Sequence, residues 1–226
     1  FVLVPGDVNS SLACAIVASR NGYKVGHIES GLRSFDRDMP EEINRILIDD
    51  LSDLFFITEQ SGINHLLNEG KENDKLHLVG NTMIDSLVAF SEHIDASSIL
   101  NTLNIKDSYG LLTFHRPSNV DNLESLTELV MTIEKISEEL TFVFPVHPRT
   151  EKNLMHFGLM ERVKCIPNLI ITSSLGYLDF MKLVKNAKIV ITDSGGIQEE
   201  TTFLQIPCLT VRENTERPIT ISEGTN

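Results

Sequence analysis

Three short segments of the chain combine residue types that can hold a phosphate group. In the first, TDSGGIQEE, Thr192 to Ser194 follow an apolar run, and Gly195 and Gly196 open an amphipathic stretch. Glycines let a backbone approach a ligand closely, and a helix that starts there offers unpaired N–H groups and the positive end of its dipole. Such a start binds anions, but the same residues fit a turn in which Ser194 caps the helix. From this segment alone the two interpretations are equally good.

The other two segments carry basic side chains. His115 and Arg116 directly follow the apolar run YGLLTF, and Arg212 and Arg217 follow PCLTV in a chain with a net charge of −13. Arginine contacts phosphate through two parallel hydrogen bonds, and histidine can donate one. Both pairs therefore fit a diphosphate and its ribose. The alternative for the first pair is a surface salt bridge beside a capping histidine. For the second pair it is a solvated charged loop, which is slightly favoured in isolation.

Carboxylates at the ends of apolar runs could transfer protons. Asp7 follows FVLV, Glu29 follows KVGHI, and Glu41 and Glu42 open an amphipathic stretch. Carboxylates that converge on a crevice can divide the roles of acid and base, because their surroundings separate their pKa values. The structural alternative is that Asp7 caps the helix that follows it and that the glutamates stabilise a helix dipole. For Glu42 we expect the structural role.

The elements that position these residues are predicted to form a parallel sheet. Short apolar runs alternate with amphipathic stretches along the chain, which is the pattern of strands connected by helices. Hydrophobic residues make up 41% of the 226 residues, but Trp is absent and aromatics are only 6%, so the core must be mostly aliphatic. Such cores suit sheets buried on both faces, whose ligands bind beyond the carboxyl ends of the strands. In the helix expected after residue 40, Ile43, Leu47 and Leu51 form the predicted apolar stripe. We therefore predict an α/β fold of two Rossmann-like, doubly wound lobes.

The predicted elements fall into two groups. Four strands with helices between them are expected to form the remainder of an N-terminal Rossmann-like lobe, residues 1–85, which carries the carboxylates. These strands are predicted at residues 1–4, 24–29, 53–58 and 75–80. Residues 86–106 are predicted to be a connector. The alternation then restarts, so residues 107–226 are predicted to form a C-terminal lobe that binds the nucleotide.

Charge and motifs exclude several classes of function. A net charge of −13, with a pI near 4.9, argues against an extended nucleic-acid or anionic-membrane surface. No apolar run is long enough to span a bilayer. The dinucleotide fingerprint, the P-loop and the nucleophile elbow of hydrolases are all absent from the sequence. The three cysteines, Cys14, Cys165 and Cys208, are expected to be reduced thiols of a cytoplasmic protein.

Taken in order, the segments GD, HIESGLRS, PEEINR, VGNTMIDSL, TDSGGIQEE and TERP resemble the UDP-N-acetylglucosamine 2-epimerases of the bacterial and archaeal type. The resemblance covers essentially the whole chain and implies a glycosyltransferase-B-type fold, with the active site between the lobes. It also implies a fragment that lacks the family's first and last elements, which the abrupt ends of the sequence suggest as well. Members of the family invert carbon 2 of the sugar. The hydrogen there leaves together with UDP to give 2-acetamidoglucal, and UDP adds back as a proton reaches the other face. No metal or other cofactor is implied.

Matching the family's motifs implies roles for individual residues. Asp7, Glu29 and Glu41 correspond to the acid and base carboxylates, and His115 to a catalytic histidine that contacts the phosphate. Glu200 is expected on the ribose, and Phe180, on a weaker match, near the uracil. The implied UDP-binding residues are His115, Arg116, Phe180, Ser194, Gly195, Gly196, Glu200 and Arg217.

Two departures from the family's pattern leave the outcome of the reaction open. The family usually has HGDT where this chain has PGDV, residues 5–8, so Asp7 loses two polar neighbours. Bacterial members often have PVH-x-NP, in a regulatory region, where this chain has PVHPRT, residues 145–150. We expect a cytoplasmic, homodimeric, non-hydrolysing epimerase that makes UDP-N-acetylmannosamine for surface polysaccharide. The alternatives are a hydrolysing epimerase that releases UDP and N-acetylmannosamine, a UDP-sugar-binding protein without turnover, and an enzyme for diacetamido-uronic acids. A glycosyltransferase of the same fold is disfavoured by the paired HIESGLRS and PEEINR segments.

Overall fold

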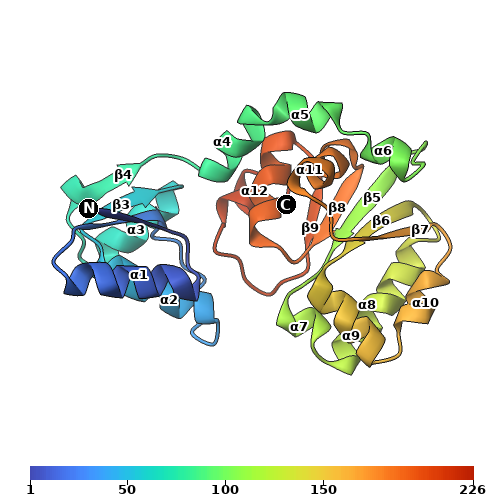
Figure 1. Ribbon diagram of the computed structural model, residues 1–226, viewed down its shortest axis with the longest axis horizontal. Helices are drawn as coiled ribbons and strands as arrows, with labels where there is room; N and C mark the ends of the chain where they lie inside the picture. The colour runs from blue at the N-terminus through green and yellow to red at the C-terminus, as the bar shows by residue number, and fades with distance from the viewer. The chain divides into compact units, whose positions relative to one another are not determined.

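Two parallel sheets account for the strands of the protein, whose computed structural model describes residues 1–226 (Figure 1). The first sheet has four strands in the order β1-β2-β3-β4, and the second has five in the order β7-β6-β5-β8-β9. Every paired strand runs parallel to its neighbour. Helices connect the strands, as parallel pairing requires. The predicted α/β class with parallel sheets is therefore confirmed.

The first sheet belongs to unit 1, which comprises Phe1–Asp85 together with Asn214–Ile219. Its strands are β1 (Val2–Pro5), β2 (Val25–Ser30), β3 (Leu54–Ile57) and β4 (Leu76–Leu78), and its helices are α1 (Asn9–Arg20), α2 (Pro40–Leu51), α3 (Gln60–Asn68) and the 3-10 turn η1 (Asn73–Lys75). Small and aliphatic side chains form the core between β1, β2, α1 and α2, where Ala15, Val25 and Ile48 are fully buried. No aromatic side chain belongs to this cluster, as the aliphatic core predicted from the composition requires.

The second sheet belongs to unit 2, which comprises Ser86–Glu213 together with Thr220–Asn226. Its strands are β5 (Tyr109–Thr113), β6 (Thr141–Val146), β7 (Leu169–Ser173), β8 (Ile189–Thr192) and β9 (Cys208–Thr210). Its helices are α5 (Ser91–Ala96), α6 (Ile99–Thr102), α7 (Pro117–Val120), α8 (Leu123–Ile136), α9 (Pro148–His156), α10 (Met160–Lys164), α11 (Tyr177–Asn186), α12 (Gly195–Leu204) and α13 (Ile219–Ser222). The first residue of α13 belongs to unit 1, and α4 (Thr82–Ala89) contains residues of both units.

Helices cover both faces of the second sheet. Successive residues of a strand point to opposite faces, so Leu112 packs in one hydrophobic cluster with α8, α9 and α10, whereas Leu111 packs in another with α11 and α12. Figure 1 shows α8, α9 and α10 on one side of these strands and α11 and α12 on the other. The doubly wound arrangement predicted for this lobe is present.

Strand β5 marks the point where the order of the second sheet reverses. From β5 the chain proceeds outward through β6 and β7, then returns to place β8 on the other side of β5, followed by β9. The connections after β5 and β8 therefore leave on opposite faces of the sheet. Ligands of open α/β sheets bind at such a switch point.

The buried face of α2 differs from the apolar stripe predicted for this helix. Leu47 is 43% exposed, whereas Ile48 and the charged residues Glu42, Arg45 and Asp49 are buried. Burying a charge is costly unless it is paired and hydrogen-bonded, so the inward face of this helix must serve a polar network. A pattern of apolar residues could not reveal such a face.

The grouping of residues into units differs from the predicted domain boundaries in two places. Residues 86–106, predicted to be a connector, include α5 and α6, whose Ile94 and Ile99 are buried in a cluster of unit 2. The short segment Asn214–Ile219 groups with unit 1, although the whole range 107–226 was assigned to the C-terminal lobe.

None of the helices combines the length and the apolar character that crossing a bilayer demands.

Candidate functional site

The loops after β5 and β8 form one candidate site, in unit 2. Strands β5 and β8 are paired up to Thr113 and Thr192, so the residues that follow them leave the sheet at the same edge. His115 and Arg116 follow β5, and Asp193 and Ser194 follow β8. The residues predicted to bind phosphate after these two strands are therefore brought together at the switch point.

Asp193 anchors the loop that carries His115. Its buried carboxylate accepts hydrogen bonds from the backbone N–H groups of His115 (3.0 Å) and Arg116 (2.9 Å) and from Asn119 Nδ2 (3.0 Å). His115 Nδ1 lies 3.1 Å from the second carboxylate oxygen. Burial alone would raise the pKa of Asp193, but the hydrogen bonds from His115, Arg116 and Asn119 outweigh it and hold the pKa below its usual range. Asp193 thus fixes the orientation of the His115 ring, a role that sequence reasoning did not assign to it.

The first turn of α12 is available to an anion. Ser194 occupies the N-cap position, yet its side chain makes no capping hydrogen bond, and the first turn contains no acidic residue. The alternative of a turn capped by Ser194 is therefore not what the structure shows. The helix begins with Gly195 and Gly196, whose N–H groups belong to the unpaired set at a helix start. In the neighbouring loop after β5, the Nε of Arg116 is shielded from solvent and has no hydrogen-bond partner.

Two further predicted UDP contacts lie in unit 2. Glu200, in α12, is 4% exposed, and its burial together with the nearby Glu199 raises its pKa to about 7. Burial and the charge of Glu200 also raise the pKa of Tyr177. Phe180, in α11, is half-buried and packs against the hydrophobic cluster beneath it. Its position is as well explained by core packing as by contact with a base.

The Glu200 carboxyl gives a prediction about stability. In the unfolded chain it ionises near 4.5, but in the folded protein near 7. Between these pH values the unfolded state loses the proton that the folded state keeps, so stability falls as pH rises through this window and stays lower above it. This difference in pKa between the unfolded and the folded state corresponds to about 3 kcal/mol in the free energy of unfolding. We expect Glu200→Gln, which cannot ionise, to raise the free energy of unfolding by up to about 3 kcal/mol at pH 8 and to change it little at pH 4.5.

Urea denaturation of the variant and the parent at both pH values measures this difference. The exposed Glu139 provides a control, since Glu139→Gln is expected to change stability by less than about 0.5 kcal/mol at either pH. An equal effect of Glu200→Gln at pH 4.5 and pH 8 would contradict the assignment of a neutral Glu200.

A separate candidate site lies in unit 1, where Glu29 has an unusual backbone. Its φ is 71°, in the left-handed region, and the register of β2 against β3 shifts at this point: Ile28 pairs with Phe56 but Ser30 with Ile57. A bulge of this kind re-aims a side chain at the end of a strand and is common beside active sites. The left-handed conformation of a residue other than glycine costs about 1–3 kcal/mol, which the surrounding structure must offset.

Each of two candidate carboxylates contacts a buried arginine. Asp7 Oδ2 lies 2.9 Å from Arg45 Nε, and Glu29 Oε1 lies 2.6 Å from Arg217 Nη2. The side chains of Asp7 and Glu29 are 31% and 29% exposed, whereas those of Arg45 and Arg217 are 3% and 9% exposed. The carboxylates therefore remain open to a ligand while their partners are fixed behind them. Asp7 does not cap α1, whose N-cap residue is Val8 and has no side-chain cap.

The two glutamates that open α2 differ in their surroundings. Glu42 is buried and accepts hydrogen bonds from the Ser34 and Phe35 backbone N–H groups, at 2.9 and 3.0 Å, and from Arg45 Nη1 at 2.6 Å. The structural role expected for Glu42 is present, although it ties down a loop rather than stabilising a helix dipole. Glu41 is half-buried in the first turn of α2 and lies outside this network.

A buried network behind Glu29 explains the HIESGLR segment. Asp49 lies 2.6 Å from His27 Nδ1 and 2.7 Å from Arg33 Nη2, and it accepts a hydrogen bond from the Gly31 backbone at 3.2 Å. Burial would raise the pKa of Asp49, but the hydrogen bond and charge of His27, with the charge of Arg33, hold it below its usual range. Gly31 must be glycine, because its φ is 78° and a Cβ atom there would lie 2.6 Å from the Gly62 carbonyl oxygen. These residues hold the turn that presents Glu29.

The position of Arg217 differs from the one predicted. Arg217 was expected in the nucleotide-binding lobe, but it groups with unit 1 and contacts Glu29 and Glu216 there. Sequence reasoning also assigned no role to Arg45 or Glu216, because the contacts of Arg45 with Asp7 and with Glu216 join residues far apart in the chain. The arginine in PEEINR, four residues after a glutamate that opens a helix, was the one available signal for Arg45.

The motif PVHPRT forms a helix start. His147 accepts a hydrogen bond at its Nδ1 from the Arg149 backbone as the N-cap of α9, and its ring centroid lies 5.3 Å from that of His115. Burial, His115 and Arg149 lower the pKa of His147. The Arg149 guanidinium pairs with Asp121 at 2.8 Å. Arg149 thus supports the loop before α8, whereas His147 lies beside the candidate site.

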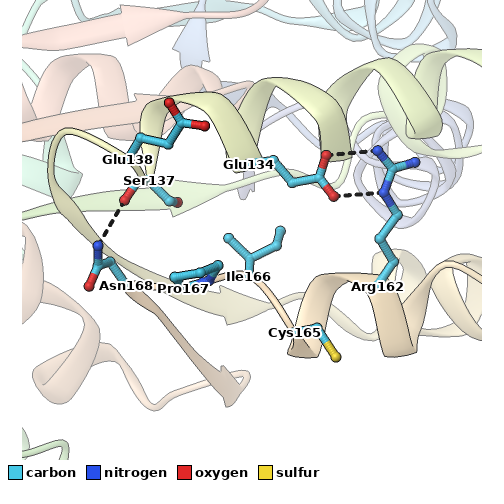
Figure 2. A pocket seen from close by; sticks show the side chains of 8 residues that line it. All are labelled: Glu134, Ser137, Glu138, Arg162, Cys165, Ile166, Pro167 and Asn168. Atoms are coloured by element: carbon cyan, nitrogen blue, oxygen red, sulfur yellow. Dashed lines mark hydrogen bonds and ion pairs between the residues drawn. The ribbon is translucent and has the colours of Figure 1, made fainter.

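A hollow of about 440 Å³ lies elsewhere on unit 2, between α8 and α10 (Figure 2). Glu134 and Arg162 are joined by two hydrogen bonds of 2.7 Å on one side of it, and Asn168 donates to the Ser137 carbonyl on the other. None of the residues predicted to bind or transform a ligand lines it. Of the polar side chains that line it, Glu134, Arg162 and Asn168 are already hydrogen-bonded, whereas the buried hydroxyl of Ser137 has no partner.

Two units, each built on a parallel sheet with connecting helices, have the architecture of the glycosyltransferase-B-type class. A family model described as UDP-N-acetylglucosamine 2-epimerase matches residues 1–226. The chain is 45% identical over 232 residues to the UDP-N-acetylglucosamine 2-epimerase of Methanococcus maripaludis, covering 100% of this chain and 63% of that protein. The chain therefore belongs to the UDP-N-acetylglucosamine 2-epimerase family, and it spans about two thirds of the length of this relative.

Two further comparisons show the breadth of this similarity. The crystal structure of the Methanocaldococcus jannaschii UDP-GlcNAc 2-epimerase, in complex with UDP-GlcNAc and UDP, matches with a TM-score of 0.93 at 44% identity, over 100% of this chain and 63% of that one. The UDP-2,3-diacetamido-2,3-dideoxy-D-glucuronate 2-epimerase of Pseudomonas aeruginosa is 40% identical over 228 residues, 100% of this chain and 62% of that protein. The predicted family resemblance is confirmed.

Proposed function

We propose that the complete protein containing this chain is a non-hydrolysing UDP-N-acetylglucosamine 2-epimerase, an isomerase that interconverts UDP-GlcNAc and UDP-ManNAc. The observation that carries the proposal is the pair of partly exposed carboxylates, Asp7 and Glu29, each held by a buried arginine in a chain of this family. Two carboxylates open to a ligand are what a reaction needs when one group removes a proton and another returns it.

Unit 2 would hold the UDP part of the substrate. The first turn of α12, with Ser194, Gly195 and Gly196, offers backbone donors to a diphosphate, and the free Nε of Arg116 adds a charged one. His115, fixed by Asp193, would contact the same phosphates. We assign Glu200 to the ribose and Phe180 to the uracil. The M. jannaschii relative, whose crystal structure contains UDP-GlcNAc and UDP, supports this class of ligand.

Unit 1 would supply the proton transfers, with Asp7, Glu29 and Glu41 as the candidate groups. One carboxylate takes the proton from carbon 2 as the electron pair of that C–H bond forms the C1–C2 double bond and the bond from carbon 1 to the UDP oxygen breaks. The products are UDP and 2-acetamidoglucal. In the second half, the UDP oxygen adds back to carbon 1 while a carboxylic acid delivers a proton to the opposite face of carbon 2. Groups that stabilise the diphosphate speed both halves, because negative charge develops on the departing UDP.

Two alternatives follow from specific observations. The Pseudomonas aeruginosa relative is named for a diacetamido-uronic acid substrate, so the sugar of this protein could carry more substituents than N-acetylglucosamine. The PGDV segment places Pro5 at the end of β1 and Val8 at the N-cap of α1, and neither flanks Asp7 with a polar side chain. A protein in which Asp7 is poorly positioned would hydrolyse the intermediate or bind a UDP-sugar without turnover.

Incubation of the complete protein with UDP-GlcNAc in heavy water separates these outcomes. We expect deuterium at carbon 2 of both UDP-GlcNAc and UDP-ManNAc, detected by NMR, because the proton that returns comes from a carboxyl group in exchange with solvent. Retention of protium in all of the product would overturn the mechanism. Accumulation of free UDP with N-acetylmannosamine would identify a hydrolysing enzyme, and UDP binding in calorimetry without exchange would identify a binding protein.

We also propose a cytoplasmic, homodimeric protein that provides UDP-ManNAc for surface polysaccharide. Cys14, Cys165 and Cys208 are free thiols, which supports a reducing compartment. The homodimer and the use of the product rest on the family resemblance alone.

A further inference from the structure

Glu216 lies between the two arginines that hold the candidate carboxylates. Its side chain is 3% exposed, and its Oε1 atom is 2.9 Å from Arg217 Nη1 and 3.7 Å from Arg45 Nη2. The same arginines contact Glu29 and Asp7 through their other nitrogens. One buried carboxylate is therefore shared by the two guanidinium groups behind the candidate catalytic residues.

The side chains of this cluster form a buried inner layer and a partly exposed outer layer. The side chains of Arg45, Arg217 and Glu216 are 3%, 9% and 3% exposed, whereas those of Asp7 and Glu29 are 31% and 29% exposed. The inner three form a rigid layer, because a planar guanidinium held at several nitrogens cannot rotate without breaking a bond. Asp7 and Glu29 are the most exposed members of the cluster, so the effect of the buried Glu216 on the sugar is exerted through them.

Stability does not explain a carboxylate in this place. A buried ion pair contributes little net stability, because desolvation of the charges offsets their attraction. The segment Asn214–Ile219 also has another attachment to unit 1, since Asn214 Nδ2 donates to Asp36 Oδ2 at 3.2 Å. What a shared carboxylate does provide is a fixed spacing between two guanidinium groups, and hence between the carboxylates that each of them holds.

We propose that Glu216 is a positioning residue, which sets the relative placement of Asp7 and Glu29 through Arg45 and Arg217. The inference rests on the proposed function, since it concerns the geometry of the two groups that exchange protons with carbon 2. A displacement of about 1 Å at a reacting group can cost on the order of 100-fold in rate. The role of Glu216 is therefore visible in kcat rather than in the binding of UDP.

The test measures epimerisation by the complete protein carrying Glu216→Gln, which keeps the shape of the side chain and removes its charge. We expect kcat to fall roughly 10- to 100-fold, with KM for UDP-GlcNAc and the Kd for UDP within about threefold of the parent. The exposed Glu213, three residues earlier in the chain, provides the matched control: Glu213→Gln is expected to keep the parental kcat.

A double-mutant cycle with Arg45→Lys distinguishes positioning from a general structural role. If Glu216 acts through Arg45, the loss of kcat in the double variant is close to that of Arg45→Lys alone, whereas independent effects multiply. Multiplying effects, a parental kcat in Glu216→Gln, or a loss of UDP binding in parallel with kcat would overturn the inference. Should the glutamine variant not fold, Glu216→Asp retains the charge but shortens the reach, and a parental kcat in that variant overturns the inference equally.

Deuterium exchange by the unmutated protein distinguishes a failure of this inference from a failure of the proposed function. A parent that exchanges deuterium at carbon 2 while Glu216→Gln remains fully active leaves the proposed function intact and removes the role of Glu216 alone. A parent that binds UDP without exchange overturns the proposed function, and the positioning role falls with it.

Discussion

Glu29→Gln in the complete protein is expected to lower kcat for epimerisation by roughly 10²- to 10⁴-fold, the range that a general acid or base contributes. Glutamine keeps the size of the side chain and can still accept a hydrogen bond from Arg217, but it cannot take or give the proton at carbon 2. The carboxylate of Glu29 is in unit 1, whereas the proposed UDP contacts other than Arg217 are in unit 2. We therefore expect the Kd for UDP, measured by calorimetry, to change by less than about tenfold, which corresponds to 1.4 kcal/mol.

A control for this variant is available in the same unit. Glu72 is exposed and pairs with Lys75 in the turn before β4, so Glu72→Gln is expected to keep the parental kcat. A Glu29→Gln protein that still incorporates deuterium at carbon 2 at the parental rate would exclude Glu29 from proton transfer. The acid and base would then have to be sought in Asp7 and Glu41.

Asp193→Asn is expected to weaken UDP binding at least tenfold and to lower the free energy of unfolding by about 3 kcal/mol, because an unsatisfied buried polar group and a lost charged hydrogen bond each cost on that order. The carboxylate accepts from two backbone N–H groups and from Asn119, and it contacts the His115 ring. An amide has only one acceptor oxygen, so its NH₂ group must face one of these donors. The His115 loop would lose its fixed place at the switch point.

Calorimetry with UDP and urea denaturation measure the two effects separately. Asp121→Asn is the matched control, because Asp121 is a partly exposed aspartate of unit 2 whose pair with Arg149 lies at the surface. A surface pair of this kind contributes about 0–1 kcal/mol, and UDP affinity should not change. Parental UDP affinity in Asp193→Asn would show that the His115 loop does not depend on this carboxylate for its position.

The strands and the strand-end residues could be predicted from the sequence for a physical reason. A parallel strand buried on both faces must be a short aliphatic run, and the residues directly after such a run lie at the ligand-binding edge of the sheet. His115 and Ser194 were located in this way, and the structure places them after β5 and β8. Asp193 was within the same motif, but its role depends on donors 74–78 residues earlier in the chain.

The arrangement of unit 1 could not be predicted by the same reasoning. The pairs Arg45–Asp7 and Arg217–Glu29 are separated by 38 and 188 residues, and no local pattern records such partners. The left-handed backbone of Glu29 interrupts a strand that reads as regular. The inward face of α2 is charged, so a search for apolar periodicity assigned its buried side wrongly. The family motifs identified Asp7 and Glu29 as candidate catalytic residues, but they did not indicate which arginines contact them.

The return of Asn214–Ile219 to unit 1 has a consequence for the order in which the protein matures. Ribosomal synthesis delivers β1 to β4 first, and domains begin to fold as they emerge. Glu29 and Arg45 are then in place while Glu216 and Arg217 have yet to be made. The contacts of Glu29 with Arg217 and of Arg45 with Glu216 can thus form only after almost the whole of unit 2 has been synthesised. A nascent chain would therefore fix the arginine partners of Asp7 and Glu29 in two stages, the second one only after the strands of unit 2 exist.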